Sequence, residues 1–272
     1  MPTVLVVDDS AVARRLISHI IDAEPDLQVV GHAHNGAEAL ALVRELRPDV
    51  VTMDIRMPIM DGYQATATLM ASTPTPIIMV SAHEPAEIAR SFRAIDAGAT
   101  MVLRKPIGLG SDDASAIARE LVESIRSVSG LRLVTRTERM RHPAPAEPMA
   151  APVPPVHRGR VEIVAIAAST GGPAAVGAIM RLLPADFPVP VVLVQHIAEG
   201  FDAGFATYID SLAALEVRLA RNGERPAAGV VYIAPNGSHL TLAAGRSIRL
   251  VDDGPIGGHR PSATPMFASI AA

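Results

Sequence analysis

The feature that most constrains the fold is a strict alternation of β-branched runs with amphipathic runs from Pro2 to Ser129. In the amphipathic runs the apolar residues recur at helical spacing, whereas the runs between them are short and rich in Val, Ile and Met. Strands and helices in alternation imply parallel strands joined by right-handed crossovers. We therefore predict a doubly wound α/β domain over residues 1–129, with five parallel strands. The expected strands read TVLVV, LQVVGH, DVVTM, PIIMV and TMVL.

A second region follows a segment dense in proline and alanine. The stretch from Arg141 to Arg160 has no apolar period and favours an extended backbone, which predicts a linker over residues 130–160. Alternation resumes at Val161. There VEIVAIA and PVVLVQ are expected as strands, PAAVGAIMRLL and GFDAGFATYIDSL as helices, and VVYIA, HLTL and SIRLV as later strands. The pattern predicts a second doubly wound α/β domain over residues 161–272.

Composition excludes several classes of protein. The 272 residues include no cysteine, so the chain has no disulfide and no thiolate metal site, and we expect it in the cytoplasm. No run approaches the roughly 18 apolar residues of a membrane-spanning helix, so no membrane insertion is expected. A net charge of -4, without a clustered basic face, argues against a nucleic-acid partner.

Three acidic residues follow predicted strands of the first domain. Asp8 and Asp9 come after the first strand, and Asp54 comes after the third. In the order 2-1-3-4-5 these strands are neighbours, and their carboxyl ends meet at one crevice. Crowded carboxylates repel one another unless a hard cation such as Mg²⁺ joins them. Each acid taken singly is explained as well by a helix cap or a turn, but together they predict a Mg²⁺ site.

Two further polar residues stand at strand ends of the same sheet. Ser81 ends the fourth strand and Lys105 follows the fifth. A carboxylate, a metal ion and a lysine suit one reaction, in which the carboxylate attacks a phosphoryl group while Mg²⁺ and Lys105 neutralise the developing charge.

Ser169 ends the first strand of the second domain and is followed by Thr170 and two glycines. One interpretation is a helix N-cap, which Ser commonly provides. The other is a nucleophile on a tight strand-to-helix turn, where a helix N-terminus stabilises negative charge. His196 ends the next strand and is placed to act as the base that such a serine needs.

The first domain resembles a known family. VLVVDDS, VTMDIRMPIMDGYQA, MVSAH and VLRKP look like the receiver domain of two-component response regulators. The resemblance implies a flavodoxin-like fold and a histidine kinase as phosphodonor. It implies Asp54 as the phospho-acceptor, Asp9 and Asp54 with the Arg56 carbonyl as Mg²⁺ ligands, Asp8 as a nearby acid, and Ser81 and Lys105 as phosphate partners. The chain departs from the family at Val102, where receivers commonly carry an aromatic switch residue.

The second domain is similar to the catalytic domain of the chemotaxis protein-glutamate methylesterases, the CheB family. The similar motifs are ASTGGP, PVVLVQHIAEGFDAGFATYID, GVVYIAPNGSHLTL and GHRPS. The resemblance implies that Ser169 attacks glutamate methyl esters of methyl-accepting chemoreceptors with His196 as base, and that glutamine deamidation follows the same route. It places Thr170 and His259 in the cleft and implies no cofactor in this domain. It also implies a receiver that covers the cleft and occludes Ser169 until Asp54 is phosphorylated.

The chain departs from this second family near its C-terminus. The family orients its histidine with an Asp in a GMG-x-DG segment, and no such segment occurs before Ala272; Thr264 also stands where the family commonly has Asp. We therefore expect a methylesterase domain that is incomplete at its C-terminus, with weak or no esterase activity. The alternative function is a phospho-accepting receiver that serves as a phosphate sink in two-component signalling.

Overall fold

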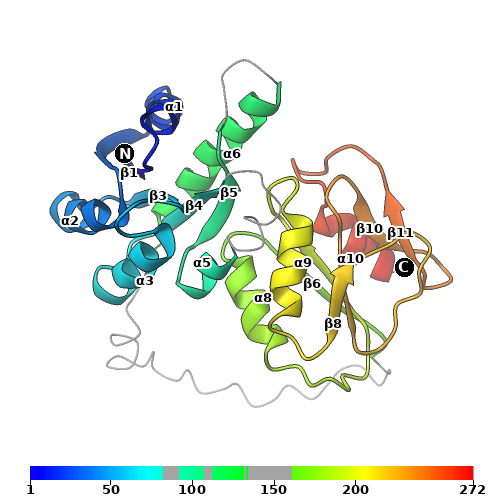
Figure 1. The fold of residues 1–272 in the computed structure, drawn as a ribbon. Coiled ribbons are helices and arrows are strands. Elements are labelled where there is room, and N and C mark those ends of the chain that lie inside the picture. Colours follow the sequence, from blue (N-terminus) through cyan, green and yellow to red (C-terminus); the bar gives the residue numbers. More distant parts are fainter. Residues whose placement is uncertain (82–91, 107–111, 132, 134–160, 272) are drawn as a thin grey trace, which may run out of the picture.

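The computed structural model describes residues 1–81, 92–106, 112–131, 133 and 161–271. Most of the predicted linker, residues 134–160, lies outside the described residues. The described chain forms two α/β units, with the N-terminal unit and the C-terminal unit each built on its own parallel sheet (Figure 1). Among the described residues, no helix is both long enough and apolar enough to cross a membrane.

The first unit contains the predicted five-stranded sheet in the order β2-β1-β3-β4-β5, and all its described strand pairs are parallel. The order predicted from the sequence is confirmed. Each strand begins and ends within about one residue of its predicted run. The strands are β1 (Thr3–Val7), β2 (Gln28–Ala33), β3 (Val50–Asp54), β4 (Ile77–Ser81) and β5 (Met101–Arg104).

Helices cover both faces of this sheet, and their starts follow local capping chemistry. The side chains of Ser10, Asn35 and Asp61 each accept a hydrogen bond from a backbone amide in the first turn of the following helix. These residues end the strand-to-helix loops and fix where each helix begins. The helices are α1 (Ala11–Asp22), α2 (Gly36–Leu46), α3 (Gly62–Ser72), α5 (Arg93–Asp96) and α6 (Asp112–Ser129).

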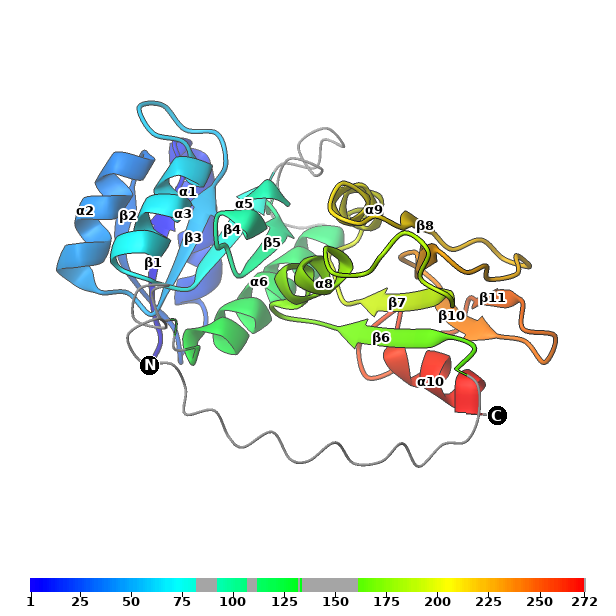
Figure 2. The same ribbon diagram turned by 90° about the horizontal axis from the view of Figure 1, so that it is seen from below.

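The second unit contains a four-stranded parallel sheet in the order β6-β7-β9-β8 and a separate antiparallel pair, β10-β11. Two elements were not predicted: β8, whose EVRL sequence is half charged, and α10. Seen from below, β11 and α10 lie at the end of this unit that is farther from the first unit (Figure 2). The elements are β6 (Val164–Ala168), α8 (Gly172–Met180), β7 (Val191–Gln195), α9 (Asp202–Asp210), β8 (Glu216–Leu219), β9 (Val230–Ile233), β10 (His239–Leu242), β11 (Ile248–Val251) and α10 (Ala263–Ala271).

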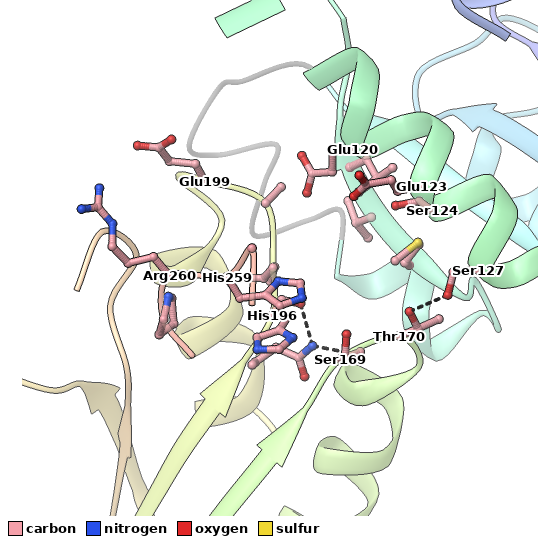
Figure 3. Close-up of a pocket in the computed structure, with 18 of the residues that line it drawn as sticks. Glu120, Glu123, Ser124, Ser127, Ser169, Thr170, His196, Glu199, His259 and Arg260 are labelled. Atoms are coloured by element: carbon pink, nitrogen blue, oxygen red, sulfur yellow. Dashed lines mark hydrogen bonds between the residues drawn. The ribbon is translucent and has the colours of Figure 1, made fainter. Parts of the chain in front are cut away.

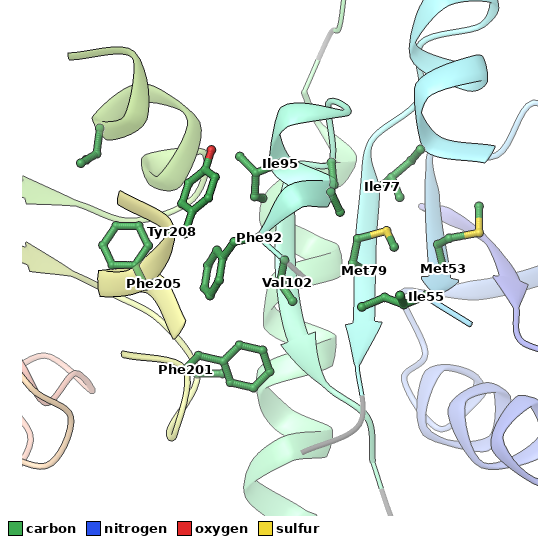
Figure 4. Packing of buried hydrophobic residues seen from close by; sticks show 14 of the residues in the cluster. Met53, Ile55, Ile77, Met79, Phe92, Ile95, Val102, Phe201, Phe205 and Tyr208 are labelled. Atoms are coloured by element: carbon green, nitrogen blue, oxygen red, sulfur yellow. The ribbon is translucent and has the colours of Figure 1, made fainter. Parts of the chain in front are cut away.

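The two units share one hydrophobic core. Phe92, which precedes α5, is 1% exposed and contacts three aromatic rings of the second unit (Figure 4). Its ring centroid lies 6.4 Å from that of Phe201, 5.6 Å from that of Phe205 and 5.6 Å from that of stacked Tyr208. Buried aromatic surface of this extent fixes how the units dock.

Polar contacts flank this aromatic cluster. The Asp96 carboxylate of α5 accepts hydrogen bonds from Arg181, at 2.9 Å, and from the Tyr208 hydroxyl, at 3.0 Å. Burial and the nearby Asp96 charge raise the pKa of Tyr208 to about 12, so its hydroxyl remains a donor at neutral pH. The Asp96–Arg181 pair is half exposed and contributes little to stability, which leaves the aromatic rings as the main interface.

Candidate functional sites

The predicted acidic cluster is present at the carboxyl edge of the first sheet. Oxygen atoms of Asp8, Asp9 and Asp54 lie within 4.8 Å of one another. Asp8 and Asp54 are buried, whereas Asp9 is exposed. The pairing of β1 with β3 brings the three side chains together. One exposed carboxylate beside two buried ones suits Mg²⁺, which keeps several of its waters.

Lys105 completes this edge of the sheet. Its Nζ lies 2.7 Å from Asp8 Oδ2 and 3.2 Å from Asp54 Oδ2. Burial alone would lower the pKa of Lys105, but the Asp8 and Asp54 carboxylates raise it above its ordinary value. Burial raises the pKa of Asp54 to about 6, with a smaller contribution from Asp8 and an opposing one from Lys105. One lysine therefore compensates only part of the negative charge, and the donor set fits a divalent cation.

Ser81 stands where the sequence predicted it, at the end of β4. It is 1% exposed, and its backbone carbonyl accepts a 2.7 Å hydrogen bond from the Lys105 amide. Arg56 follows β3 two residues after Asp54. Val102 lies in β5 and is 5% exposed, so the position of the usual aromatic switch holds an aliphatic core residue here.

The backbone at Ser169 does not fit the interpretation that this serine caps a helix. Helix α8 begins at Gly172, and its N-cap residue is Gly171 with a φ of 74°. That left-handed conformation favours glycine. The Ser169 carbonyl accepts a 2.7 Å hydrogen bond from the Gly172 amide, which closes the turn before the helix. Ser169 is therefore not the N-cap, and its side chain lies outside the helix, close to the positive end of its dipole.

His196 follows β7 directly, as predicted. Its backbone amide donates a 2.9 Å hydrogen bond to the Ala168 carbonyl, which places it beside the Ser169 turn. The ring of His196 stacks on the ring of His259, with centroids 3.8 Å apart and planes 11° from parallel. Within the described part of the chain, Nε2 of His196 is buried and has no hydrogen-bond partner. An unpaired imidazole nitrogen is available to accept a proton.

Burial lowers the pKa of His196 below its usual 6.5, and the neighbouring His259 lowers it further. We expect His259→Phe, which keeps an aromatic ring but removes the imidazole, to raise the pKa of His196 part of the way back. The recovery is partial because burial remains. A proton NMR titration of the histidine rings measures this shift. His19→Phe, at an exposed position of α1, is the control. An unchanged or lower pKa of His196 in His259→Phe would contradict the prediction.

A cavity of about 890 Å³ lies at this site and is lined by residues of both domains. Ser169, Thr170, His196 and His259 line one wall, and residues of β5 and α6 line the other (Figure 3). The hydroxyls of Thr170 and Ser127, 3.2 Å apart, form a hydrogen bond from the Ser169 turn to α6. The predicted cleft positions of Thr170 and His259 thus lie in the cavity.

The first domain spans the cleft without sealing it. Ser169 and Thr170 remain exposed even though they line the cavity between the domains. The occlusion of Ser169 expected before phosphorylation stays a prediction: the first domain lines the same cavity, and Ser169 itself keeps solvent exposure. Helix α6 of the first domain lines the opposite wall of the cavity.

Several residues that shape the site were not identified from the sequence. Ser127 and Glu120 enter the cavity from α6, and Phe92 anchors the domain interface. Gln195 holds two backbone carbonyls in the second domain. Gln195 carried a usable signal, since it is a polar residue at the end of an apolar strand, like Asp54. The others had none, because their roles depend on how the two domains pack against each other.

In the part of the chain that the structure describes, no acidic residue near the C-terminus contacts the ring of His196. The Asp252 carboxylate instead accepts a 3.0 Å hydrogen bond from Arg260. Thr264 lies in α10. Nε2 of His196 is without a partner, and its ring contacts His259. Among the described residues, orientation of this ring rests on stacking.

Comparisons with known proteins match both domains. The family model described as "Response regulator receiver domain" matches residues 4–116, and the model described as "CheB methylesterase" matches residues 164–272.

Full-length relatives share the same domain order. A protein-glutamate methylesterase/protein-glutamine glutaminase 3 of Anaeromyxobacter dehalogenans (strain 2CP-C) is 50% identical over 100% of this chain and 78% of that protein. Similar enzymes of Nitrosospira multiformis and Myxococcus xanthus (strain DK1622) are 42% and 44% identical over 100% and 98% of this chain, and over 77% and 76% of their own lengths. These matches confirm the resemblance, and the chain belongs to the CheB family of receiver-linked protein-glutamate methylesterases.

Proposed function

We propose that this chain is a phosphorylation-activated methylesterase that acts on glutamate methyl esters of chemoreceptors in chemotaxis adaptation, and on receptor glutamines as a deamidase. The observation that carries the proposal is the placement of Ser169 and His196 at adjacent strand ends, in one cavity that the receiver domain also lines. The relatives' names, which include protein-glutamate methylesterase and protein-glutamine glutaminase, support this substrate class.

The proposed reaction uses Ser169 as nucleophile and His196 as general base. Ser169 Oγ attacks the glutamyl carbonyl while His196 takes its proton, and the ester C–O bond breaks as that proton passes to the departing methanol. Water then attacks the acyl-enzyme, and His196 takes the proton of the water and returns it to Ser169. For a glutamine substrate the leaving group is ammonia. The lowered pKa of His196 supports the role of base, because burial and His259 favour the neutral ring over the protonated one.

The receiver site is proposed to accept a phosphoryl group on Asp54 from a histidine kinase. Asp9, Asp54 and the Arg56 carbonyl would hold Mg²⁺, which would neutralise charge on the transferred group. Lys105 lies within 3.2 Å of Asp54 and is proposed to pair with the phosphoryl oxygens. Ser81 would donate to another of these oxygens. Asp8, ion-paired to Lys105 at 2.7 Å, would keep this lysine charged and in place.

Phosphorylation is proposed to act by admitting a bulky substrate. Because Ser169 is already exposed in this structure, we expect phosphorylation to speed demethylation of a receptor while hydrolysis of a small methyl ester changes little. Methanol release from both substrates, with and without a small-molecule phosphodonor, tests the proposal. Asp54→Asn is the control that cannot accept the phosphoryl group. Equal stimulation of both substrates would contradict steric admission, and equal stimulation of Asp54→Asn would contradict the role of Asp54.

The aromatic interface is expected to hold the domains in the resting arrangement. Truncating a buried Phe commonly costs about 3–5 kcal/mol of packing, so Phe92→Ala should release the receiver from Phe205 and Tyr208. We expect several-fold faster receptor demethylation by Phe92→Ala without phosphodonor. Tyr208→Phe, which removes only the hydroxyl bonded to Asp96, is the matched control with a smaller effect. A basal rate equal to that of the parent chain would contradict this role.

The second candidate function is a receiver that takes up phosphate without ester hydrolysis. It is favoured by one observation, since no carboxylate among the described residues contacts the ring of His196. Loss of the orienting acid in a Ser-His-Asp site can cost about 10⁴-fold in turnover where the geometry survives. Phosphate uptake at Asp54 without any methanol release would favour this alternative.

The division into a receiver over residues 1–129, a linker over residues 130–160 and an esterase domain over residues 161–272 remains a prediction. So does the cytoplasmic location, which rests on the absence of cysteine. Both are consistent with the proposed partners, a histidine kinase and the chemoreceptors.

A further inference from the structure

One buried side chain joins the proposed nucleophile to the proposed base. The amide nitrogen of Gln195 donates a 2.9 Å hydrogen bond to the Ser169 carbonyl and another 2.9 Å hydrogen bond to the His196 carbonyl (Figure 3, dashed lines). Gln195 is 3% exposed. Two carbonyl acceptors fix the orientation of the amide, because the opposite orientation would set its oxygen against both of them.

The surrounding packing holds this amide in place. A Cβ at Gly172 would lie 2.8 Å from Gln195 Cδ and closer still to its Oε1, so a larger residue there would displace this amide. Gln195 also ends β7 opposite Ala168, whose carbonyl accepts the His196 amide. The turn at Ser169 and the turn at His196 are therefore joined twice, by the backbone hydrogen bonds of the strands and by the Gln195 amide.

We propose that Gln195 is a positioning residue that sets the separation of Ser169 and His196 by bridging their carbonyls. This inference rests on the proposed roles of Ser169 and His196. Gln195 itself does not reach the reacting atoms. Its amide would hold the two turns at one spacing, because moving either turn breaks a buried hydrogen bond. A misplacement of about 1 Å in such a pair can cost about 100-fold in rate.

The test compares three variants in the 272-residue chain. Gln195→Met keeps the length of the side chain but removes both donors. Gln195→Glu is isosteric and accepts but does not donate when ionised; when protonated, it donates one hydrogen bond. Gln64→Met, on the exposed face of α3, is the control for the substitution itself. Two readouts are the rate of Ser169 labelling by a fluorophosphonate and the NMR signals of the His196 ring.

We expect Gln195→Met to label about 10- to 100-fold more slowly than the parent and to shift the His196 ring signals, while Gln64→Met changes neither. Relative to the parent at each pH, Gln195→Glu should regain labelling as the pH is lowered and its buried carboxyl becomes protonated. A side chain that only fills space would show no such recovery. Should Gln195→Met not fold, the Glu variant decides, because one polypeptide is compared at two pH values.

The outcomes separate this inference from the proposed function. Parent-like labelling and unchanged His196 signals in Gln195→Met would overturn the positioning role. If the parent chain is not labelled at Ser169, yet Gln195→Met still shifts the His196 ring signals, the esterase proposal fails while the bridge stands.

Discussion

Ser169→Ala is expected to lower methanol release by the phosphorylated 272-residue chain by at least about 100-fold. Removing the serine of a complete triad costs about 10⁶-fold in turnover. Where no acid orients the histidine, about 10⁴-fold of this is already lost, so about 10²-fold is the smallest loss expected here. Headspace measurement of methanol from methylated receptor checks this. The variant should still accept phosphate at Asp54, because the two sites lie in separate domains.

The control for this prediction is another serine. Ser72 is exposed at the end of α3, and its hydroxyl donates to the Thr68 carbonyl, so Ser72→Ala should release methanol at the parent rate. Methanol release by Ser169→Ala at the rate of Ser72→Ala would show that another group carries out the hydrolysis. If neither the two variants nor the parent chain releases methanol, the phosphate-sink function is favoured.

Gly62→Ala is expected to lower the free energy of unfolding of the receiver domain by about 3 kcal/mol or more. A Cβ at Gly62 would meet the backbone carbonyl of Asp54, at 3.1 Å from the carbon and closer still to the oxygen, and would also lie 3.0 Å from Met79 Cε. Backbone atoms cannot rotate away, so β3 or α3 has to move, and overpacking of a core costs about 1–3 kcal/mol or more. The Gly62 amide, bonded to the Ile55 carbonyl at 2.9 Å, would be disturbed as well.

Urea unfolding of the parent and the variant measures this loss, and phosphate uptake is expected to fall with it because Asp54 itself would shift. Gly130→Ala is the matched control, since a Cβ there would contact nothing within 4 Å. A midpoint in Gly62→Ala within error of that in Gly130→Ala would mean that the loop after β3 relaxes at little cost.

Much of the fold and of both sites followed from local pattern. Strand alternation predicted a parallel sheet, whose strands carry their carboxyl ends to the same side. With the order 2-1-3-4-5 of a doubly wound sheet, Asp8, Asp9 and Asp54 then meet at one edge. Ser169 and His196 were found for the same reason. The pattern could not decide whether Ser169 is the N-cap of α8, since that depended on the backbone of Gly171, which takes the N-cap position. The role of Ser169 as nucleophile stays a proposal.

The sequence by itself determined which residues stand at the strand ends, because the hydrophobic period and the length of each strand depend on residues close together in the chain. Only the tertiary structure decided what faces those ends. The stack of His196 on His259, the bridge by Gln195 and the contact of Phe92 with Tyr208 join residues from different turns, strands or domains. Such contacts depend on how the surfaces of different elements pack and which side chains are desolvated together. The hydrophobic periodicity of a single segment does not determine this packing.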